Sequence, residues 1–569
     1  MSLTLPGLSV LGKQWRLRDD APFAQPYEQR AFLARLLKLR GVESKEAARA
    51  FLEPSLPAPA ELPNLEGAVE RLARAVRDSE RIAIYGDYDA DGITGTAVLV
   101  EGITALGGRA VPYIPDRFAE GYGLNTDALR LLMEEGASLV VSVDTGTSAW
   151  HEVAYANERE LDVIVVDHHL PKGPLPDAVA IVNPRLAGAP ESHAHLSGCG
   201  TAFIVVRALA ERLGRPLDAL ALLDLVAIST VCDVVALTGI NRALVSLGLE
   251  QIRRRARIGI SALIESAGLG EKPITARSLG FQLGPRINAA GRLGHANTAY
   301  ELLTTRHPDR ARELAEQLSA INAERQLLTE EARTACLALA EQECAGAPLI
   351  MVGSETVHQG IAGLVAGRLA ERYYRPAIVY QIRADGTAVG SARSIPGFNI
   401  HDLLARGEGT FMRWGGHPQA GGFTVRTEQL PALRATLTRA AAEMHDWSNA
   451  YPILDVDFEL PLDARLPREG IDKLLQRLEP CGMENAAPVF LARQVRVLRS
   501  TLTRDGKHVQ LTLAGERNRP GWRGIAFGLG AHAPHVDASV DLVYQLSEDT
   551  WAGGMQVQVK DLRPSLATA

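Results

Sequence analysis

The 569-residue sequence predicts an α/β protein in which a long helix joins two α/β regions and a small β-barrel or sandwich follows. Three observations support this fold class: alternating apolar strands and helices over about residues 80–240, a stretch without Gly or Pro from Arg310 to Glu343, and short β-rich segments after about Tyr451. Strands that alternate with helices are typical of a parallel sheet. At roughly 150 residues per domain, the length predicts three or four domains.

The first α/β region contains five apolar segments that we expect to be strands. These segments are 81–85, 109–114, 138–144, 162–169 and 178–183. Helical segments such as 126–136 separate them, and the apolar positions Ala97, Val100, Ile103 and Leu106 recur at helical spacing after the first strand. The pattern therefore predicts a parallel sheet with helices packed on it.

The rest of the chain divides into a helix, a second α/β region and a β-rich region. Arg310–Glu343 predicts one helix of roughly 30 residues, about 45 Å long at 1.5 Å per residue, suited to joining two bodies. Strands are expected at 348–354, 376–382 and 387–394, before the glycine-rich segment 414–423. The later strands, at 488–503, 507–515, 522–528 and 539–549, have the spacing of a small barrel or sandwich.

Composition narrows the class of protein. The sequence is 46% hydrophobic and 22% charged, as in soluble globular proteins, and no apolar run reaches the roughly 18 residues of a membrane span. The N-terminus lacks the pattern of a signal peptide, so we expect a cytoplasmic protein without membrane association. The five cysteines lack CxxC spacing, which argues against a zinc cluster or a disulfide framework.

The net charge of −7 does not indicate a nucleic-acid-binding protein, but charge can be local. Arg253, Arg254, Arg255 and Arg257 form one basic run. A solvated helix face is the favoured interpretation of this run.

The segment "IYGDYDADGIT" (84–94) places Asp87, Asp89 and Asp91 at alternate positions after the first strand. Like charges this close raise one another's pKa unless a cation neutralises them, so a metal site is one hypothesis. A solvated acidic turn is the other, because Asp and Gly are ordinary turn residues. The C-terminal ends of parallel strands form the edge at which α/β sheets bind ligands.

Other metal-capable residues follow the same pattern. Asp144 ends one predicted strand, and Asp167, His168 and His169 end another. Asp233 lies in an apolar segment predicted to be a helix, where an unpaired charge would be costly. Carboxylates with imidazole and no thiolate favour Mn²⁺, with Mg²⁺ as a substitute, and this many acids suit two divalent ions bridged by one Asp.

Ordered motifs carry a resemblance to known proteins. "GDYDADG", "VSVDTG", "VVDHH" and "STVCDVV" resemble the motifs of the DHH phosphoesterase superfamily. "GPRINAAGRLGH", "HQGIAGLVAGRL", "GSARSIPGFNIHDLL" and "GGHPQAGGF" resemble those of its RecJ family, which are single-stranded-DNA-specific exonucleases. The resemblance runs from about residue 45 to the end. It implies a DHH-type parallel-sheet domain (46–308), a connecting helix (309–345), a smaller DHHA1-type α/β domain (346–447) and an OB-like β-barrel (448–569), after an N-terminal segment (1–45).

The family pattern also implies roles for individual residues. Those that match metal ligands are Asp89, Asp91, Asp144, His168 and Asp233, with Asp144 bridging two ions. His169 matches the histidine that orients or protonates the substrate, Asp87 assists the first metal, and Tyr85 stands where some members have a ligating histidine. The resemblance further implies 5′→3′ polarity, release of mononucleotides, roles in DNA repair and recombination, a monomeric enzyme, and single-stranded-DNA-binding protein and a RecQ-type helicase as partners.

Several residues outside the metal motifs are candidates to hold single-stranded DNA. The candidate substrate-binding residues are Arg117, Tyr122, Arg286, Asn288, Ser391, Arg393 and His417. Hydroxyl, amide and guanidinium groups bind phosphate, and an exposed tyrosine stacks on a base. For Tyr122 the alternative is core packing, and for the glycines around His417 it is a tight turn. In the C-terminal region, Arg496, Arg499, Lys507 and Trp522 are candidate DNA contacts or ordinary surface residues.

Two other functions fit parts of the sequence. A small-substrate phosphodiesterase of the superfamily, acting on short oligonucleotides or pyrophosphate, would not need the long helix or the third domain. A non-catalytic DNA-binding scaffold would not need its buried carboxylates, which are costly without a role. An exonuclease accounts for all of these features.

Overall fold

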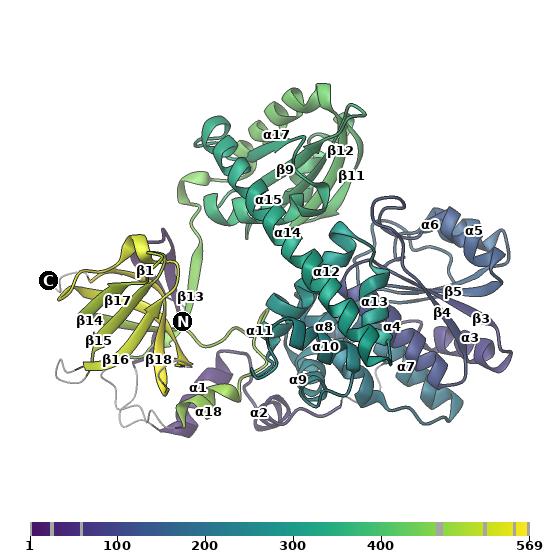
Figure 1. The fold of residues 1–569 in the computed structure, drawn as a ribbon, viewed down its shortest axis with the longest axis horizontal. Helices are drawn as coiled ribbons and strands as arrows, with labels where there is room; N and C mark the ends of the chain where they lie inside the picture. The colour runs from purple at the N-terminus through teal and green to yellow at the C-terminus, as the bar shows by residue number, and fades with distance from the viewer. Residues whose placement is uncertain are drawn as a thin grey trace. The chain divides into compact units, whose positions relative to one another are not determined.

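The computed structural model describes residues 3–22, 28–56, 61–462, 470–515, 520–549 and 553–565 (Figure 1). These residues form two compact units. The first comprises the described parts of 1–291, 295–319 and 453–569, and the second comprises 292–294 and 320–452. Among the described helices, none combines the length and the apolar character needed to cross a membrane.

The first sheet has five parallel strands, as the alternation of strands and helices predicts. Its order is β4 (Arg109–Tyr113), β3 (Arg81–Gly86), β5 (Ala137–Val143), β6 (Asp162–Val166) and β7 (Ala180–Val182). In β3, Ile82 and Ile84 pack in one hydrophobic cluster while Ala83 and Tyr85 pack in another. Burial on both faces explains why these strands are almost continuously apolar.

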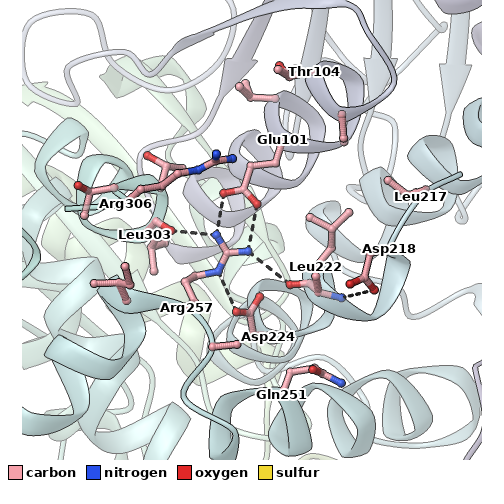
Figure 2. A pocket seen from close by; sticks show the side chains of 18 residues that line it. Glu101, Thr104, Leu217, Asp218, Leu222, Asp224, Gln251, Arg257, Leu303 and Arg306 are labelled. Carbon is pink, nitrogen blue, oxygen red and sulfur yellow. Dashed lines mark hydrogen bonds and ion pairs between the residues drawn. The ribbon is translucent and has the colours of Figure 1, made fainter. Parts of the chain in front are cut away.

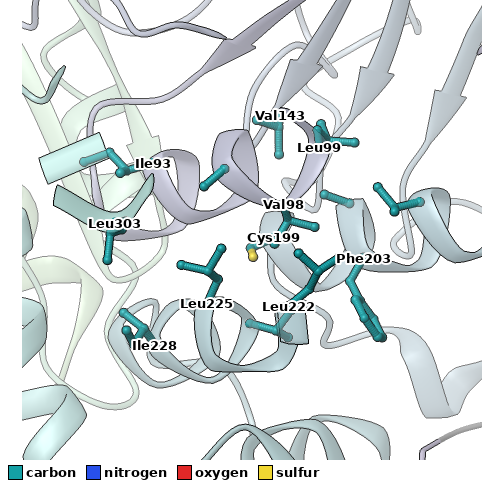
Figure 3. Packing of buried hydrophobic residues seen from close by; sticks show 14 of the residues in the cluster. Ile93, Val98, Leu99, Val143, Cys199, Phe203, Leu222, Leu225, Ile228 and Leu303 are labelled. Atoms are coloured by element: carbon teal, nitrogen blue, oxygen red, sulfur yellow. The ribbon is translucent and has the colours of Figure 1, made fainter. Parts of the chain in front are cut away.

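Helices from both sides of the sheet fix the position of its C-terminal edge. One cluster contains residues of α3 (Leu65–Arg77), α4 (Ala90–Ala105), α7 (Gly198–Leu213) and α8 (Leu223–Cys232); the other contains residues of α5 (Thr126–Glu134) and α6 (Trp150–Asn157). Figure 3 shows α4, α7 and α8 packing through Val98, Cys199 and Leu225. A Cβ on Gly102 would lie 2.3 Å from the side chain of Val206, so α4 and α7 approach closely.

The basic run is only partly a solvated helix face. Arg253 and Arg254 are exposed at the end of α9 (Gly239–Arg253), whereas Arg257 lies between α9 and α10 (Ile258–Ser266) and is only 12% exposed. Its guanidinium bonds Glu101 through two nitrogens, Asp224 at 2.8 Å and two backbone carbonyls (Figure 2). These bonds use all five N–H donors. Arg257 therefore stabilises the wall of a cavity of about 620 Å³ and has no donor left for a ligand.

Further helices of the first unit are α11 (Ala276–Ser278), the π-helix η3 (Leu279–Leu283), α12 (Gly284–Leu293), whose last two residues belong to the second unit, and α13 (Asn297–Thr304). The predicted long helix is confirmed as α14, Pro308–Glu343, with 36 residues. It begins in the first unit and ends in the second.

The second unit contains a five-stranded sheet with α15 (Gln359–Tyr373), α16 (Ile400–Ala405) and α17 (Leu430–Met444). The strand order is β11 (Phe411–His417), β12 (Ala420–Arg426), β10 (Thr387–Arg393), β9 (Ala377–Ile382) and β8 (Ile350–Ser354). The glycine-rich segment 414–423 lies mostly in the β11–β12 hairpin, so the tight-turn interpretation is wrong for most of its glycines.

The C-terminal sheet confirms the predicted barrel and extends it. Its order is β1 (Leu3–Leu8), β2 (Gln14–Asp19), β13 (Ile453–Glu459), β14 (Phe490–Leu502), β15 (Val509–Ala514), β16 (Pro520–Ala526), β18 (Met555–Pro564) and β17 (Ser539–Glu548). Pairing of β14 with β17 closes five of these strands into a barrel. The prediction of Trp522 as a DNA contact is wrong, because its ring is 4% exposed and its Nε1 donates to the carbonyl of Leu462 at 2.8 Å.

The N-terminal segment is part of this sheet. Strand β2 pairs in parallel with β13, matching Arg16 with Asp455, and Phe32 of α1 (Gln29–Lys38) packs edge-on against Phe458 with ring centroids 5.7 Å apart. Residues near the start of the chain therefore stabilise the C-terminal barrel. The domain borders expected from the sequence stay a prediction.

Candidate metal centre

The C-terminal ends of β3, β5 and β6 bring the predicted acids and histidines together. Three groups each have ligand atoms within 4.8 Å of one another: Asp87, Asp89 and Asp144; Asp91, His168 and Asp233; Asp144, His168 and His169. The Nε2 atom of His168 lies 3.1 Å from Asp144, 3.6 Å from Asp233 and 3.7 Å from Asp91. Asp144 belongs to two of the groups, a position that suits a shared ligand.

Two local features shape the backbone of this site. Asp89 is the N-cap of α4, where its Oδ1 accepts hydrogen bonds from the amides of Asp91 at 2.9 Å and Gly92 at 3.2 Å. Asp144 has a φ of 63°, an uncommon conformation for a residue other than glycine and one that concentrates at functional sites. A Cβ on Gly198 would lie 2.9 Å from the Cα of Asp144, so the start of α7 lies directly against it.

Helix α12 holds the loop that carries the first three acids. The Oδ1 of Asn288 accepts a hydrogen bond from the amide of Ala90 at 2.8 Å. A Cβ on Gly291 would lie 2.3 Å from the carbonyl oxygen of Tyr88. The "GPRINAAGRLGH" motif therefore includes residues that pack on the metal loop. Arg286 bonds Ser319 at 3.1 Å and the carbonyl of Gln282 at 2.6 Å, and phosphate binding by Arg286 and Asn288 stays a prediction.

The electrostatics of the site favour a bound cation. Burial, reinforced by neighbouring carboxylates, raises the pKa of Asp87, Asp144 and Asp233 above the usual range. Within the described structure, Asp87 Oδ1, Asp144 Oδ1 and His168 Nε2 are buried and make no hydrogen bond. Divalent cations satisfy such atoms and neutralise the repulsion, and a set of carboxylate and imidazole ligands without thiolate fits Mn²⁺ or Mg²⁺.

Asp233 lies at the C-cap of α8, with its side chain 26% exposed. The sequence-based placement inside an apolar helix is therefore wrong. From the end of the helix its Oδ2 lies 3.6 Å from His168 Nε2.

Asp167 belongs to none of the three groups and instead orients His169. Its Oδ1 lies 2.8 Å from His169 Nδ1, and its Oδ2 accepts a hydrogen bond from the amide of Thr147 at 3.0 Å. Burial lowers the pKa of His169, but the hydrogen bond and charge of Asp167 outweigh it and raise the pKa to about 9. The contact with Asp167 therefore favours the protonated form of the His169 ring.

Aromatic side chains border the acids. Tyr122 is 55% exposed, so core packing does not explain it, and its ring centroid lies 6.2 Å from that of His169. Tyr88 has its ring 6.4 Å from Tyr122, and the guanidinium of Arg117 lies 4.8 Å from the Tyr88 ring centroid. Sequence reasoning missed Tyr88, although its position between Asp87 and Asp89 was a usable signal.

Tyr85 holds the loop that carries Tyr122. Its side chain is fully buried, its hydroxyl donates to the carbonyl of Gly123 at 2.9 Å, and the hydroxyl oxygen accepts from the side-chain Nδ2 of Asn125 at 3.1 Å. The phenol is thus engaged away from the acids, and Tyr85 does not replace a metal-ligating histidine.

In the second unit, three predicted phosphate contacts lie close together on one sheet. Ser391 and Arg393 point to the same face of β10, with Arg393 Nη1 donating to Ser391 Oγ at 3.3 Å. A Cβ on Gly363 of α15 would lie 2.6 Å from the Arg393 guanidinium, so this glycine makes room for it. Arg393 pairs with Ala420, which pairs with His417. Ser391, two residues earlier, pairs with Gly422, which pairs with Gly415. The sheet beside Ser391 is therefore bare enough for a backbone to approach.

Comparison with protein families gives three matches along the chain. The model of the DHH family, N-terminal domain, matches residues 81–230, the DHHA1 domain model matches 346–443, and the RecJ OB domain model matches 456–561.

Individual proteins match over most of the chain. The single-stranded-DNA-specific exonuclease RecJ of Bacillus subtilis is 36% identical over 540 residues, which cover 93% of this chain and 67% of that protein. The Escherichia coli protein of the same name is 34% identical over 96% of this chain and 98% of its own length. The crystal structure of RecJ in complex with Mn²⁺ from Thermus thermophilus superimposes with a TM-score of 0.83 at 33% identity, covering 97% of this chain and 80% of that one. Identity is above 30% with all three of these relatives, and the match covers from two thirds to almost all of their own length. This chain therefore belongs to the RecJ family.

Proposed function

We propose that this chain is a metal-dependent exonuclease that hydrolyses the phosphodiester bonds of single-stranded DNA. The observation that carries the proposal is the convergence of three ligand groups within 4.8 Å, linked through Asp144 and His168. Similarity to single-stranded-DNA-specific exonucleases over nearly the whole chain supports the substrate. Similarity to RecJ structures in complex with Mn²⁺ and with Mg²⁺ supports the cofactor.

In this proposal Asp87, Asp89, Asp91, Asp144, His168 and Asp233 hold two divalent ions. When bound, two such ions activate a water molecule and stabilise the leaving oxygen of the phosphodiester. Asp167 holds His169 in one orientation at 2.8 Å, so that its ring can orient the phosphoryl group or donate a proton to it. We assign His169 to catalysis, together with Asp87, which is also one of the six ligands.

The proposed DNA contacts divide into three kinds. Exposed Tyr122 stacks on a base near the scissile bond, with Arg117 and Tyr88 beside it. Arg286, Asn288, Ser391, Arg393 and His417 contact phosphates. The barrel adds affinity along the strand through exposed Arg499, Lys507 and Phe527. Free bases are available for stacking only in single strands, which is the physical reason for the specificity.

We further propose 5′→3′ polarity, release of mononucleotides, and action as a cytoplasmic monomer in DNA repair and recombination. Single-stranded-DNA-binding protein and a RecQ-type helicase are the proposed partners. These points rest on the family resemblance.

A comparison of end labels tests the activity and its direction. A long single strand labelled at its 5′ end should yield labelled mononucleotide from the first turnover in the presence of Mn²⁺, whereas a 3′ label should persist on shortening strands. A blocked 5′ end should prevent both. Loss of the 3′ label first would refute the polarity, and equal rates on dinucleotides and long strands would refute the exonuclease assignment.

A further inference from the structure

A buried chain of hydroxyl groups lies behind the metal centre. Ser229 Oγ donates to Asp91 Oδ1 at 2.6 Å, and Ser197 Oγ lies 2.6 Å from Ser229 Oγ. The exposure of these three residues is 1% or less. Since Ser229 has a single hydroxyl proton and gives it to Asp91, Ser197 donates its own proton to Ser229. Ser197 in turn accepts from the amide of Gly200 at 3.0 Å as the N-cap of α7.

Two backbone amides complete the hold on Asp91. At the start of α7, Gly198 N donates to Oδ2 at 2.7 Å and Cys199 N donates to Oδ1 at 2.8 Å. The N-terminal end of a helix carries partial positive charge, so it favours the ionised carboxylate. Oδ1 therefore accepts two hydrogen bonds and Oδ2 accepts one. With two lone pairs on each oxygen, the remaining capacity is on Oδ2, the atom that lies 3.7 Å from His168 Nε2.

The position of Ser229 links two of the candidate ligands. The amide of Asp233 donates to the carbonyl of Ser229 at 2.9 Å, so the two residues lie one turn apart at the end of α8. Residues four apart share a helix face. The last turn of α8 thus presents Asp233 and at the same time fixes the carboxylate of Asp91.

We propose that Ser229, supported by Ser197, is a positioning residue of the metal centre: its hydroxyl occupies Oδ1 of Asp91 and leaves Oδ2 as the one oxygen that Asp91 offers to a divalent cation. This inference rests on the proposed metal-dependent function. Without the hydroxyl, Asp91 keeps the two amide bonds from α7 but loses one of the three bonds that fix its orientation, and Oδ1 regains capacity to bind other groups.

Mn²⁺ binding to the full chain without DNA tests this role. Ser229→Ala should raise the Mn²⁺ dissociation constant of the site by about 10- to 100-fold, the loss typical when a partner that orients a ligand is removed. Thr230→Val is the matched control. Thr230 is the next residue and is fully buried, and its hydroxyl donates to the carbonyl of Val226 in its own helix at 2.7 Å, away from Asp91. It should bind Mn²⁺ like the wild type. Ser197→Ala should weaken binding less than Ser229→Ala, since Ser229 still reaches Asp91.

Calorimetric titration with Mn²⁺, combined with thermal unfolding in chelator, separates positioning from packing. Wild-type affinity in Ser229→Ala would overturn the proposal, as would equal weakening in Ser229→Ala and Thr230→Val. If Ser229→Ala does not fold, the comparison of Ser197→Ala with Thr230→Val decides in the same way. Cleavage of labelled single-stranded DNA by the wild type is measured in parallel. If the wild type binds Mn²⁺ but does not cleave DNA, the proposed function is refuted, and the titration still decides whether Ser229 positions Asp91.

Discussion

Replacement of Gly291 by alanine tests how α12 supports the metal loop. A Cβ at this position would lie 2.3 Å from the carbonyl oxygen of Tyr88, whereas real Cβ contacts essentially never fall below 3.0 Å. The loop between Asp87 and Asp89, or the helix, must therefore move by at least 0.7 Å (3.0 minus 2.3). A functional constellation tolerates displacements of only about 0.5 Å, and a misplacement of about 1 Å can cost 100-fold in rate.

We therefore expect Gly291→Ala to lower the Mn²⁺-dependent cleavage rate by about 10- to 100-fold. Overpacking should also destabilise the first unit by about 1–3 kcal/mol. Initial rates on an end-labelled single strand and thermal unfolding in chelator measure the two effects. Gly67→Ala in α3 is the control, because its Cβ would meet only Ala180 at 4.0 Å, and alanine in a helix is otherwise favourable. A Gly291→Ala protein with wild-type rate and stability would refute the reasoning.

Three further predictions concern the acids, the second unit and the barrel. Asp144→Asn should reduce cleavage by at least about 100-fold, since it changes the residue shared by two ligand groups. The same substitution should raise the unfolding temperature in chelator, because it removes like-charge repulsion among the buried acids. A lower unfolding temperature would contradict this reasoning. Arg393→Ala should raise the dissociation constant for single-stranded DNA by about 10-fold or more, because a charge-assisted hydrogen bond to phosphate is lost. Fluorescence anisotropy measures the binding, and Arg372→Ala, at an exposed position, is the control. Unchanged binding by the Arg393→Ala protein would contradict the prediction. Phe527→Ala should raise the DNA concentration for half-maximal rate by about 5- to 150-fold, equivalent to roughly 1–3 kcal/mol for one stacked base, while turnover at saturating DNA stays constant. Val536→Ala, at a similarly exposed position, is the control and should have no effect. Equal effects of the two substitutions would show that Phe527 does not contact DNA.

Strand ends were the most predictable part of the site. Asp87, Asp144 and His168 follow apolar strands of a parallel sheet, and such strands end at one edge, so their convergence follows from local sequence and topology. Asp233 was predicted as a ligand, but its place at the helix end was not, because an apolar run does not mark where a helix stops.

Long-range contacts were beyond sequence reasoning. Asn288 bonds Ala90 across 198 residues, and no local pattern distinguishes that amide from a phosphate contact. Likewise, the pairing of β2 with β13 depends on the folded barrel, and so does the burial of Trp522. An aromatic residue in an alternating strand faces either the core or the solvent, and a shift of one residue in register decides which.

The central claim is that these residues form one centre for two divalent ions. A crystal of the wild-type protein soaked in Mn²⁺ tests it most directly through anomalous scattering. We expect two peaks, one among Asp87, Asp89 and Asp144 and one among Asp91, His168 and Asp233, with Asp144 contacting both ions. A crystal with no peak at these groups, or with Mn²⁺ only at other acids, would contradict the account.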